Sequence, residues 1–159
     1  MEKTGPADVT VSTWTAGGAD LTKSAQLLKD TKFRSMRWVV DCSFPQRQPG
    51  YAKALVTLFG HDAIRTTRTH AKFVLIVNEN WKVVIRTSMN LNQNPRLETL
   101  EVSDDPALCD FLTNIVDTIF RQERPADYAT KTTPELAGIP SVAPQQSIAA
   151  GLVVRVGNG

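Results

Sequence analysis

Four side chains that can bind a phosphate fall within one short stretch of the chain. His70 and Lys72 lie at the start of an apolar run, and Ser88 and Asn90 follow a second apolar run. Both runs have strand composition, and the polar residues 78–82 between them have the length of a hairpin loop. An imidazole, an ammonium group, a hydroxyl and an amide on one patch would form a site for an oxyanion.

A hairpin centred near Asn80 predicts how these side chains pair. Antiparallel partners then have residue numbers that sum to about 160, so Lys72 is expected to face Ser88. By the same count His70 faces Asn90. Because strand side chains alternate between faces, His70 and Lys72 lie on one side of the first strand. The four side chains are therefore expected to converge.

The rest of the chain predicts alternating strands and helices. Further strands are expected at 9–14, at 36–40, at 63–69 with continuation through His70, and at 97–102. Helices are expected from 21 to about 29 after the N-cap Asp20, from 51 to 59 before Gly60, and from Asp105-Pro106 to about 122. Residues 45–50 are expected to form a polar loop. This order predicts a three-layer α/β fold, with a mixed β-sheet flanked by helices on both faces.

Composition limits the class of protein. With 159 residues, 42% of them hydrophobic, the chain is long enough for one domain with a core, which we place at 8–122. Residues 1–7 are expected to be flexible, and the Pro/Ala/Ser-rich residues 123–159 to form an extended or disordered tail. Within that tail, the apolar segment 148–156 could be an edge strand or a segment that docks on a partner.

Charge and apolar runs say little about location and partners. The net charge of +2 does not by itself diagnose nucleic-acid binding. No apolar run reaches the roughly 20 residues that span a bilayer, and the first residues lack a signal-peptide pattern, so a cytoplasmic protein is expected. Cys42 and Cys109 lack metal-ligand spacing and are expected to be reduced thiols. We expect no metal and no cofactor.

The pattern His70-Ala71-Lys72 followed by Ser88-Met89-Asn90 resembles the phospholipase D superfamily. That family's signature is His-x-Lys, four residues, Asp, then Gly-Ser-x-Asn. Glu98 and the acidic-Pro helix start at 105–106 also fit its layout, and the resemblance covers about residues 8–122 with a single copy of the motif. Two positions depart from it, because Val77 stands at the motif Asp and Thr87 replaces the Gly. Asn78 and Glu79 could replace that Asp only with a shift of one or two residues. The threonine variant is similar to a group of phage and prophage proteins.

The resemblance implies a phospholipase D-like fold and a specific chemistry. His70 would attack phosphorus and form a phosphohistidine, while Lys72, Ser88 and Asn90 would stabilise the equatorial oxygens. Glu98 would hold the other ring nitrogen of His70. The leaving oxygen needs a second acid, which family members supply from a second motif copy. A single copy therefore implies a homodimer, with two His70 side chains meeting across a two-fold axis.

The leading hypothesis is a metal-independent phosphodiester hydrolase of the single-copy bacterial nuclease type, with nucleic acid as substrate and no membrane partner. The alternative is a catalytically impaired phospholipase D-like protein that binds DNA or serves as an assembly module, with a tail that could bind another protein. Four arginines flank the site region and could form a solvated face or follow a polyanionic backbone: Arg65, Arg68, Arg86 and Arg96. His61 is interpreted as a loop residue, and Trp14 and Trp38 as core or interface residues.

Overall fold

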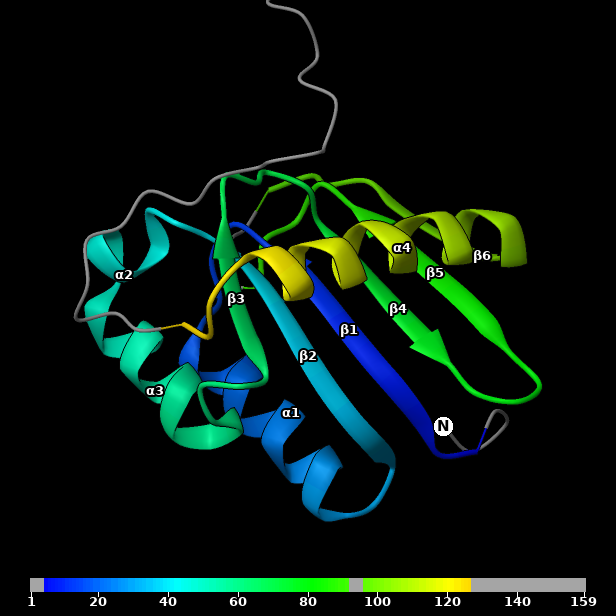
Figure 1. The fold of residues 1–159 in the computed structure, drawn as a ribbon, viewed down its shortest axis with the longest axis horizontal. Coiled ribbons are helices and arrows are strands. Elements are labelled where there is room, and N and C mark those ends of the chain that lie inside the picture. Colours follow the sequence, from blue (N-terminus) through cyan, green and yellow to red (C-terminus); the bar gives the residue numbers. More distant parts are fainter. Residues whose placement is uncertain (1–4, 92–95, 127–159) are drawn as a thin grey trace, which may run out of the picture.

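The strands of the protein form one six-stranded sheet in the order β3-β2-β1-β4-β5-β6. The computed structural model describes residues 5–91 and 96–126 (Figure 1). The elements, in chain order, are β1 (Ala7–Thr13), α1 (Gly18–Lys29), β2 (Phe33–Asp41), α2 (Phe44–Arg47), α3 (Pro49–Phe59), β3 (Ile64–Thr67), β4 (Phe73–Val77), β5 (Lys82–Thr87), β6 (Leu100–Asp104) and α4 (Pro106–Gln122).

The sheet has a parallel half and an antiparallel half. β1, β2 and β3 are parallel, because α1 and α3 return the chain to the same end of the sheet before each new strand. β4 is antiparallel to β1, and β5 and β6 follow it as antiparallel neighbours. The sheet is therefore mixed.

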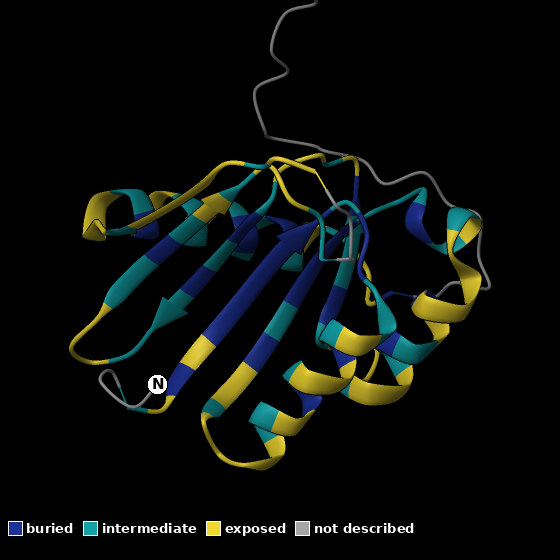
Figure 2. Ribbon diagram, turned by 180° about the vertical axis from the view of Figure 1, so that it is seen from behind, coloured by how far each residue is buried: buried dark blue, intermediate teal, exposed yellow. Residues whose placement is uncertain are grey.

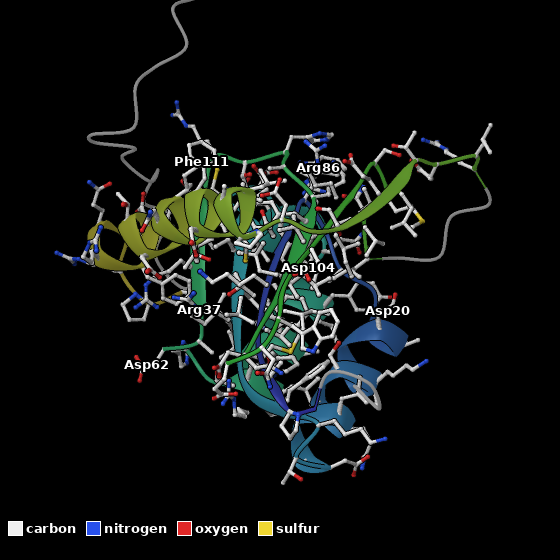
Figure 3. All side chains as sticks on the ribbon, turned by 90° about the vertical axis from the view of Figure 1, so that its right-hand side faces the viewer. Asp20, Arg37, Asp62, Arg86, Asp104 and Phe111 are labelled. Atoms are coloured by element: carbon white, nitrogen blue, oxygen red, sulfur yellow. The ribbon has the colours of Figure 1, made fainter. Side chains whose placement is uncertain are left out.

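Helices cover both faces of this sheet, which confirms the predicted fold class. α1 and α3 pack on one face, and α4 crosses the other, as the opposite positions of Asp20 and Phe111 show (Figure 3). The alternation of side chains along each strand divides the core into two layers. The α1–α3 layer contains Val9, Val11, Met36, Trp38, Val40, Leu21, Phe44, Leu55 and Ile64. The α4 layer contains Val39, Phe73, Leu75, Val84, Cys109, Val116 and Ile119.

Several predicted boundaries are corrected by the structure. α1 begins at Gly18 with Gly17 as its N-cap, so Asp20 lies in the first turn and not at the cap. The expected loop 45–50 contains the short helix α2 and the start of α3, because the fully buried Phe44 anchors this segment in the core. The strand expected at 97–102 begins three residues later, at Leu100.

The segment that carries His70 is not a strand, so the predicted continuation of the third strand is wrong. β3 ends at Thr67 and β4 begins at Phe73. We call residues 68–72 the β3–β4 connection. Because β2 and β1 lie between β3 and β4, this connection must pass the ends of two strands. The distance from β3 to β4 is three strand spacings, about 14 Å, and the five-residue connection is only slightly longer than this distance.

The hairpin exists, but its register differs by one residue from the prediction. Phe73 pairs with Arg86 and Val77 with Lys82, so the residue numbers sum to 159. The loop therefore has the four residues 78–81. The Asn78 side chain accepts hydrogen bonds from two loop amides and closes the turn. By this register Lys72 lies opposite Thr87, whose amide donates to the Lys72 carbonyl oxygen at 3.1 Å.

The end of the described chain packs on the domain. α4 begins as predicted, with the Asp105 side chain accepting a hydrogen bond from the Leu108 amide at 3.0 Å. Beyond the expected boundary at 122, Ala126 is buried and its amide donates to the Ile64 carbonyl oxygen. Ala7, expected in a flexible N-terminus, is buried in β1. The segment 148–156 lies outside the described residues. None of the described helices is long and apolar enough to cross a bilayer.

Candidate active site

Two hydrogen bonds fix the β3–β4 connection over the ends of the parallel strands. The Thr69 amide donates to Asp41 Oδ2 at 3.2 Å, where β2 ends. The Ser12 hydroxyl of β1 donates to the Ala71 carbonyl oxygen at 2.9 Å. His70 lies between these two anchors, beyond the carboxyl ends of β1 and β2. This is the edge of an α/β sheet at which ligands bind.

Trp14 supports the exposed side chain of His70, and Arg47 in turn supports Trp14. The indole ring of Trp14, directly after β1, lies with its centroid 5.4 Å from that of the imidazole. The Arg47 guanidinium covers the Trp14 ring at 3.5 Å and donates to the Trp14 carbonyl oxygen at 3.0 Å. Trp14 is half-buried, whereas Trp38 is fully buried in the core. Trp14 therefore positions the imidazole from one side.

Lys72 contacts His70 directly. Its Nζ atom lies 3.0 Å from Nδ1 and 3.5 Å from Nε2, and it donates to the His70 carbonyl oxygen at 2.9 Å. Burial lowers the pKa of Lys72, and the nearby Glu98 carboxylate acts against this by raising the pKa. An ammonium group that donates to a ring nitrogen occupies the lone pair needed for attack. The contact must open before His70 can act as a nucleophile.

Ser88 and Glu98 form the second half of the site. The Ser88 hydroxyl donates to Glu98 Oε2 and accepts a hydrogen bond from the Thr99 amide at 2.9 Å. The structure thus places Glu98 against Ser88, whereas a contact with His70 was expected. The reason is that β6 starts at Leu100 and leaves Glu98 in the loop beside the end of β5. Its role in orienting His70 remains a prediction.

A pocket of about 280 Å³ opens beside Lys72, on the face of the sheet that carries α1. Asn90 lines this pocket together with Lys72, and the buried Asn90 Oδ1 has no hydrogen-bond partner among the described residues. The five predicted residues therefore gather at one edge of the sheet. His70 contacts Lys72, Lys72 shares the pocket with Asn90, and Glu98 links Lys72 to Ser88.

Three residues that support the site were not found by sequence reasoning: Asp41, Ser43 and Arg47. In addition to the bond from the Thr69 amide, the Asp41 carboxylate accepts hydrogen bonds from the Ser43 amide at 2.9 Å and from the Ser43 hydroxyl. The Ser43 hydroxyl in turn accepts from Arg47 Nε at 3.0 Å. An acidic residue at the end of a buried strand was the available signal. Its link to Thr69, however, depends on the sheet order.

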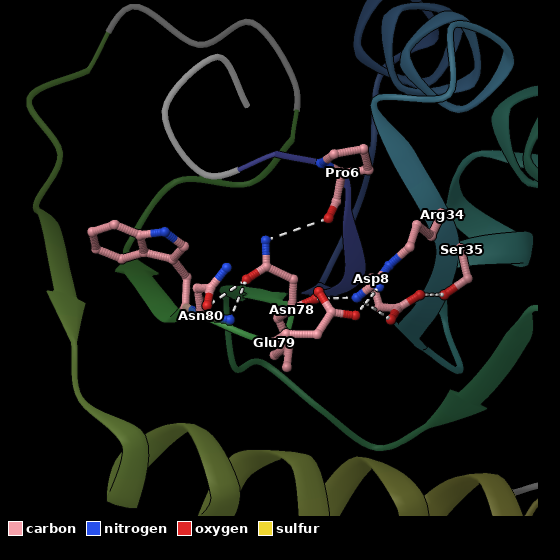
Figure 4. Close-up of polar contacts among 9 residues, drawn as sticks. Pro6, Asp8, Arg34, Ser35, Asn78, Glu79 and Asn80 are labelled. Atoms are coloured by element: carbon pink, nitrogen blue, oxygen red, sulfur yellow. Dashed lines mark hydrogen bonds and ion pairs between the residues drawn. The ribbon is translucent and has the colours of Figure 1, made fainter.

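Val77, which stands where the motif has Asp, lies at the opposite end of β4 from His70. Val77 ends β4, and the hairpin that follows carries Asn78 and Glu79 (Figure 4). There Arg34 of β2 pairs with Glu79 and with Asp8 at 3.2 Å. A five-residue strand is about 16 Å long, so neither Asn78 nor Glu79 can supply a carboxylate or amide at the His70 end. Glu79 instead joins the hairpin to Arg34 of β2, and the Asn78 side chain donates to the Pro6 carbonyl oxygen just before β1 at 3.3 Å.

The flanking arginines have separate roles. Arg65 stacks on the Phe120 ring at 4.5 Å and donates to backbone carbonyl oxygens, and burial lowers its pKa. Arg86 pairs with Glu101. Arg68 lies exposed on the β3–β4 connection beside His70, and Arg96 is exposed. Of the four, Arg68 is therefore placed best to contact a polyanion at His70.

Of the other residues singled out in the sequence, His61 and Cys109 lie away from the site, whereas Cys42 stands between Asp41 and Ser43. His61 is in the loop before β3, as predicted, and its Nδ1 lies 2.6 Å from the Ala126 carbonyl oxygen. Cys109 is buried in α4, and Cys42 is half-buried after β2. Burial raises the pKa of both thiols.

Comparison with known proteins assigns no family. No protein-family model matches the chain, and no curated protein matches it. Among solved structures, a polyphosphate kinase from Porphyromonas gingivalis is similar, with a TM-score of 0.49 and 16% sequence identity. The similarity covers 76% of this chain and 19% of that protein. At this TM-score the likeness transfers neither a family nor an activity.

Proposed function

We propose that this chain is a metal-independent phosphodiester hydrolase of the phospholipase D type that acts on nucleic acid. The observation that carries the proposal is the β3–β4 connection. It sets His70 and Lys72 over the carboxyl ends of two strands, next to a pocket that contains Asn90. Supporting residues hold the imidazole, the ammonium group and the carboxylate in one contact network. Such an arrangement is typical of a nucleophile with its oxyanion-binding groups.

The chemistry starts when the substrate phosphate draws Lys72 away from His70. A ring nitrogen of His70 then attacks phosphorus, the P–N bond forms, and the P–O bond to the leaving oxygen breaks. Lys72, Ser88 and Asn90 stabilise the charge on the equatorial oxygens. A water molecule next attacks phosphorus and the P–N bond breaks, which restores His70. A base must take the proton from that water molecule.

The mechanism needs a second general acid–base group, and no second histidine lies at the site, because His61 precedes β3 and contacts the Ala126 carbonyl oxygen. This group must first protonate the leaving oxygen and then accept the proton of the attacking water. We assign this role to His70 of a second copy. A surface that could bring two copies together lies beside the site, because no described helix covers β4, β5 and β6 on the α1 side (Figure 2). On that face Leu100 and Val102 are 60% and 61% exposed, and Leu100 lies next to the end of β5.

The second candidate function is a protein that binds DNA, or serves in assembly, without cleaving it. One observation favours it: the Glu98 carboxylate bonds to Ser88, and a negative charge at this position opposes phosphate binding until it moves. Both functions need phosphate contacts, so affinity that falls steeply with salt is expected for each of them. Only cleavage separates the two.

Cleavage of a labelled oligonucleotide in excess EDTA tests the proposal. Wild type should cleave, and His70→Ala should be slower by at least about a thousandfold, as for the loss of a covalent nucleophile. His61→Ala is the matched control and should cleave as wild type does. Equal rates for His70→Ala and wild type would rule out the mechanism. Binding without cleavage in wild type would favour the second candidate.

Sedimentation tests the shared site. A wild-type dimer is expected, and Val102→Lys should weaken it and reduce cleavage in proportion, because it places a charge on the exposed face. Lys82→Ala alters a lysine whose side chain bonds to Asp110 of α4, on the other side of the sheet, and should change neither property. A strictly monomeric protein that cleaves would exclude the two-histidine chemistry.

A further inference from the structure

The pocket beside Lys72 differs in its hydrogen-bonding chemistry from the phosphate site. Three hydroxyl groups line it, and each donates its proton to a backbone carbonyl oxygen. The bonds run from Ser12 to Ala71, from Thr13 to Thr15 and from Thr87 to Thr99. These hydroxyl protons are therefore not available to a ligand. Apart from Lys72 and the Asn90 amide nitrogen, which are assigned to the phosphate site, the polar side chains of the lining offer acceptors.

Two acceptors in the pocket are suited to a ligand that donates. Asn90 Oδ1 is buried and has no partner among the described residues, and Asp20 brings a carboxylate from the first turn of α1. A buried acceptor without a partner is costly, and a ligand N–H would remove that cost. The Asp20 charge acts against a second phosphate or a carboxylate inside the pocket. The preferred ligand group is therefore neutral, or cationic, and rich in N–H donors.

The walls and the size of the pocket suit an aromatic ring. Val11, Val74 and Leu91, which belong to the α1–α3 layer, line it with apolar side chains. Its volume of about 280 Å³ is near the lower limit for small-molecule sites and leaves no room for a base pair. A nucleobase combines a flat apolar body with N–H donors at its edge. It meets the requirements of both the walls and the two acceptors.

We propose that this pocket binds the nucleobase next to the scissile phosphate, with its N–H groups donating to Asn90 Oδ1 and Asp20. The inference rests on the proposed function, because it places that phosphate at Lys72. A base can enter the pocket only when it is unstacked and unpaired, so the substrate is single-stranded nucleic acid or an unpaired nucleotide. Asn90 would thus contact both parts of the substrate, the phosphate through its amide nitrogen and the base through Oδ1.

Binding to the full chain with His70→Ala, which is not expected to cleave, tests the inference. The probes are a fluorescent eight-nucleotide cytidine strand and an abasic strand of the same length and charge. We expect the cytidine strand to bind at least about tenfold more tightly, because it gains hydrogen bonds and apolar contacts. A duplex of the same length should bind no better than the abasic strand.

Variants of the pocket should remove the preference for bases only. Asp20→Ala is expected to reduce the ratio of the two affinities to below about threefold without weakening the abasic strand. Asp30→Ala, an exposed acid at the other end of α1, is the control and should keep the full ratio. Val74→Phe fills the pocket and should act as Asp20→Ala does. Thermal unfolding checks the fold of Val74→Phe. If this variant does not fold, the test rests on Asp20→Ala alone.

The outcomes separate this inference from the proposed function. Equal affinities for the cytidine and abasic strands would overturn the base site, and so would an Asp20→Ala variant that keeps the full ratio. Tight duplex binding would overturn it as well. A base preference that depends on Asp20, in a protein that never cleaves in EDTA, would support the base site and reject only the hydrolase.

Discussion

Asp41 is the residue whose replacement best tests how the fold holds His70. Its carboxylate accepts three hydrogen bonds: one from the Thr69 amide, one from the Ser43 amide and one from the Ser43 hydroxyl. Asp41→Ala removes all of them and leaves the Thr69 amide without its partner. The β3–β4 connection then keeps the Ser12 bond to the Ala71 carbonyl oxygen and the Thr87 bond to the Lys72 carbonyl oxygen.

The size of the effect follows from these three bonds. A hydrogen bond to a charged group contributes about 1.5–3 kcal/mol when it is buried, but Asp41 is only half-buried and two of its bonds share one residue. We therefore expect Asp41→Ala to lower the free energy of unfolding by about 2–4 kcal/mol. Asp41→Asn keeps one acceptor oxygen and should lose about half of that. Cleavage should fall roughly a hundredfold in Asp41→Ala, because His70 is no longer fixed.

Urea unfolding and amide hydrogen exchange measure the two parts of this prediction. Exchange at Thr69 and His70 should accelerate in Asp41→Ala, whereas exchange in the middle of β1 should change only as far as global stability does. Asp62→Ala, which alters an exposed loop aspartate, is the control and should behave as wild type does. If Asp41→Ala unfolds within 0.5 kcal/mol of wild type (roughly the effect of an ordinary surface change) with unaltered exchange at Thr69, the assigned role of Asp41 is refuted.

Three further predictions concern charge and ring contacts. Glu98→Gln removes the carboxylate that raises the pKa of Lys72. The alkaline limb of the pH–cleavage profile should therefore move to lower pH. An unchanged limb would exclude Lys72 as its source. Arg34 lowers the pKa of Glu79 by a hydrogen bond, so wild type should be more stable than Arg34→Ala above the ordinary glutamate pKa, and the difference should disappear as the pH falls through the lowered pKa. Urea unfolding at two pH values measures this, and a difference that grows in acid would contradict it. Trp14→Ala should lower kcat about tenfold with little change in KM, since an aromatic contact contributes about 0.5–1.5 kcal/mol. Trp14→Phe should restore most of the rate. A change in KM alone would argue for substrate stacking instead.

Local signals predicted much of the fold. The Asp105-Pro106 start and the helical spacing that follows it located α4, and Gly60 marked the end of α3. The α/β class followed from the alternation of strand and helix patterns. These features depend on neighbouring residues, which is why they can be found in a single sequence.

The geometry of the site could not be predicted in this way. The hairpin pattern predicts His70 on a strand, but the sheet order sends that part of the chain across the ends of β2 and β1. The partners of Thr69 and Ala71 are therefore far away in sequence. The same limit hid the stack of Arg47 on Trp14, which joins residues 33 positions apart. The residues of the site could be named from the sequence, whereas their contacts depend on long-range pairing.

Capture of the covalent intermediate tests the central claim most directly. A single turnover of an oligonucleotide with a labelled scissile phosphate, in EDTA, is stopped with alkali, and the peptides are analysed by mass spectrometry. We predict a phosphoryl adduct on His70 in wild type and none in His70→Ala. Cleavage by wild type with the label on another residue, or with none on the protein, would contradict the assignment of His70 as the nucleophile.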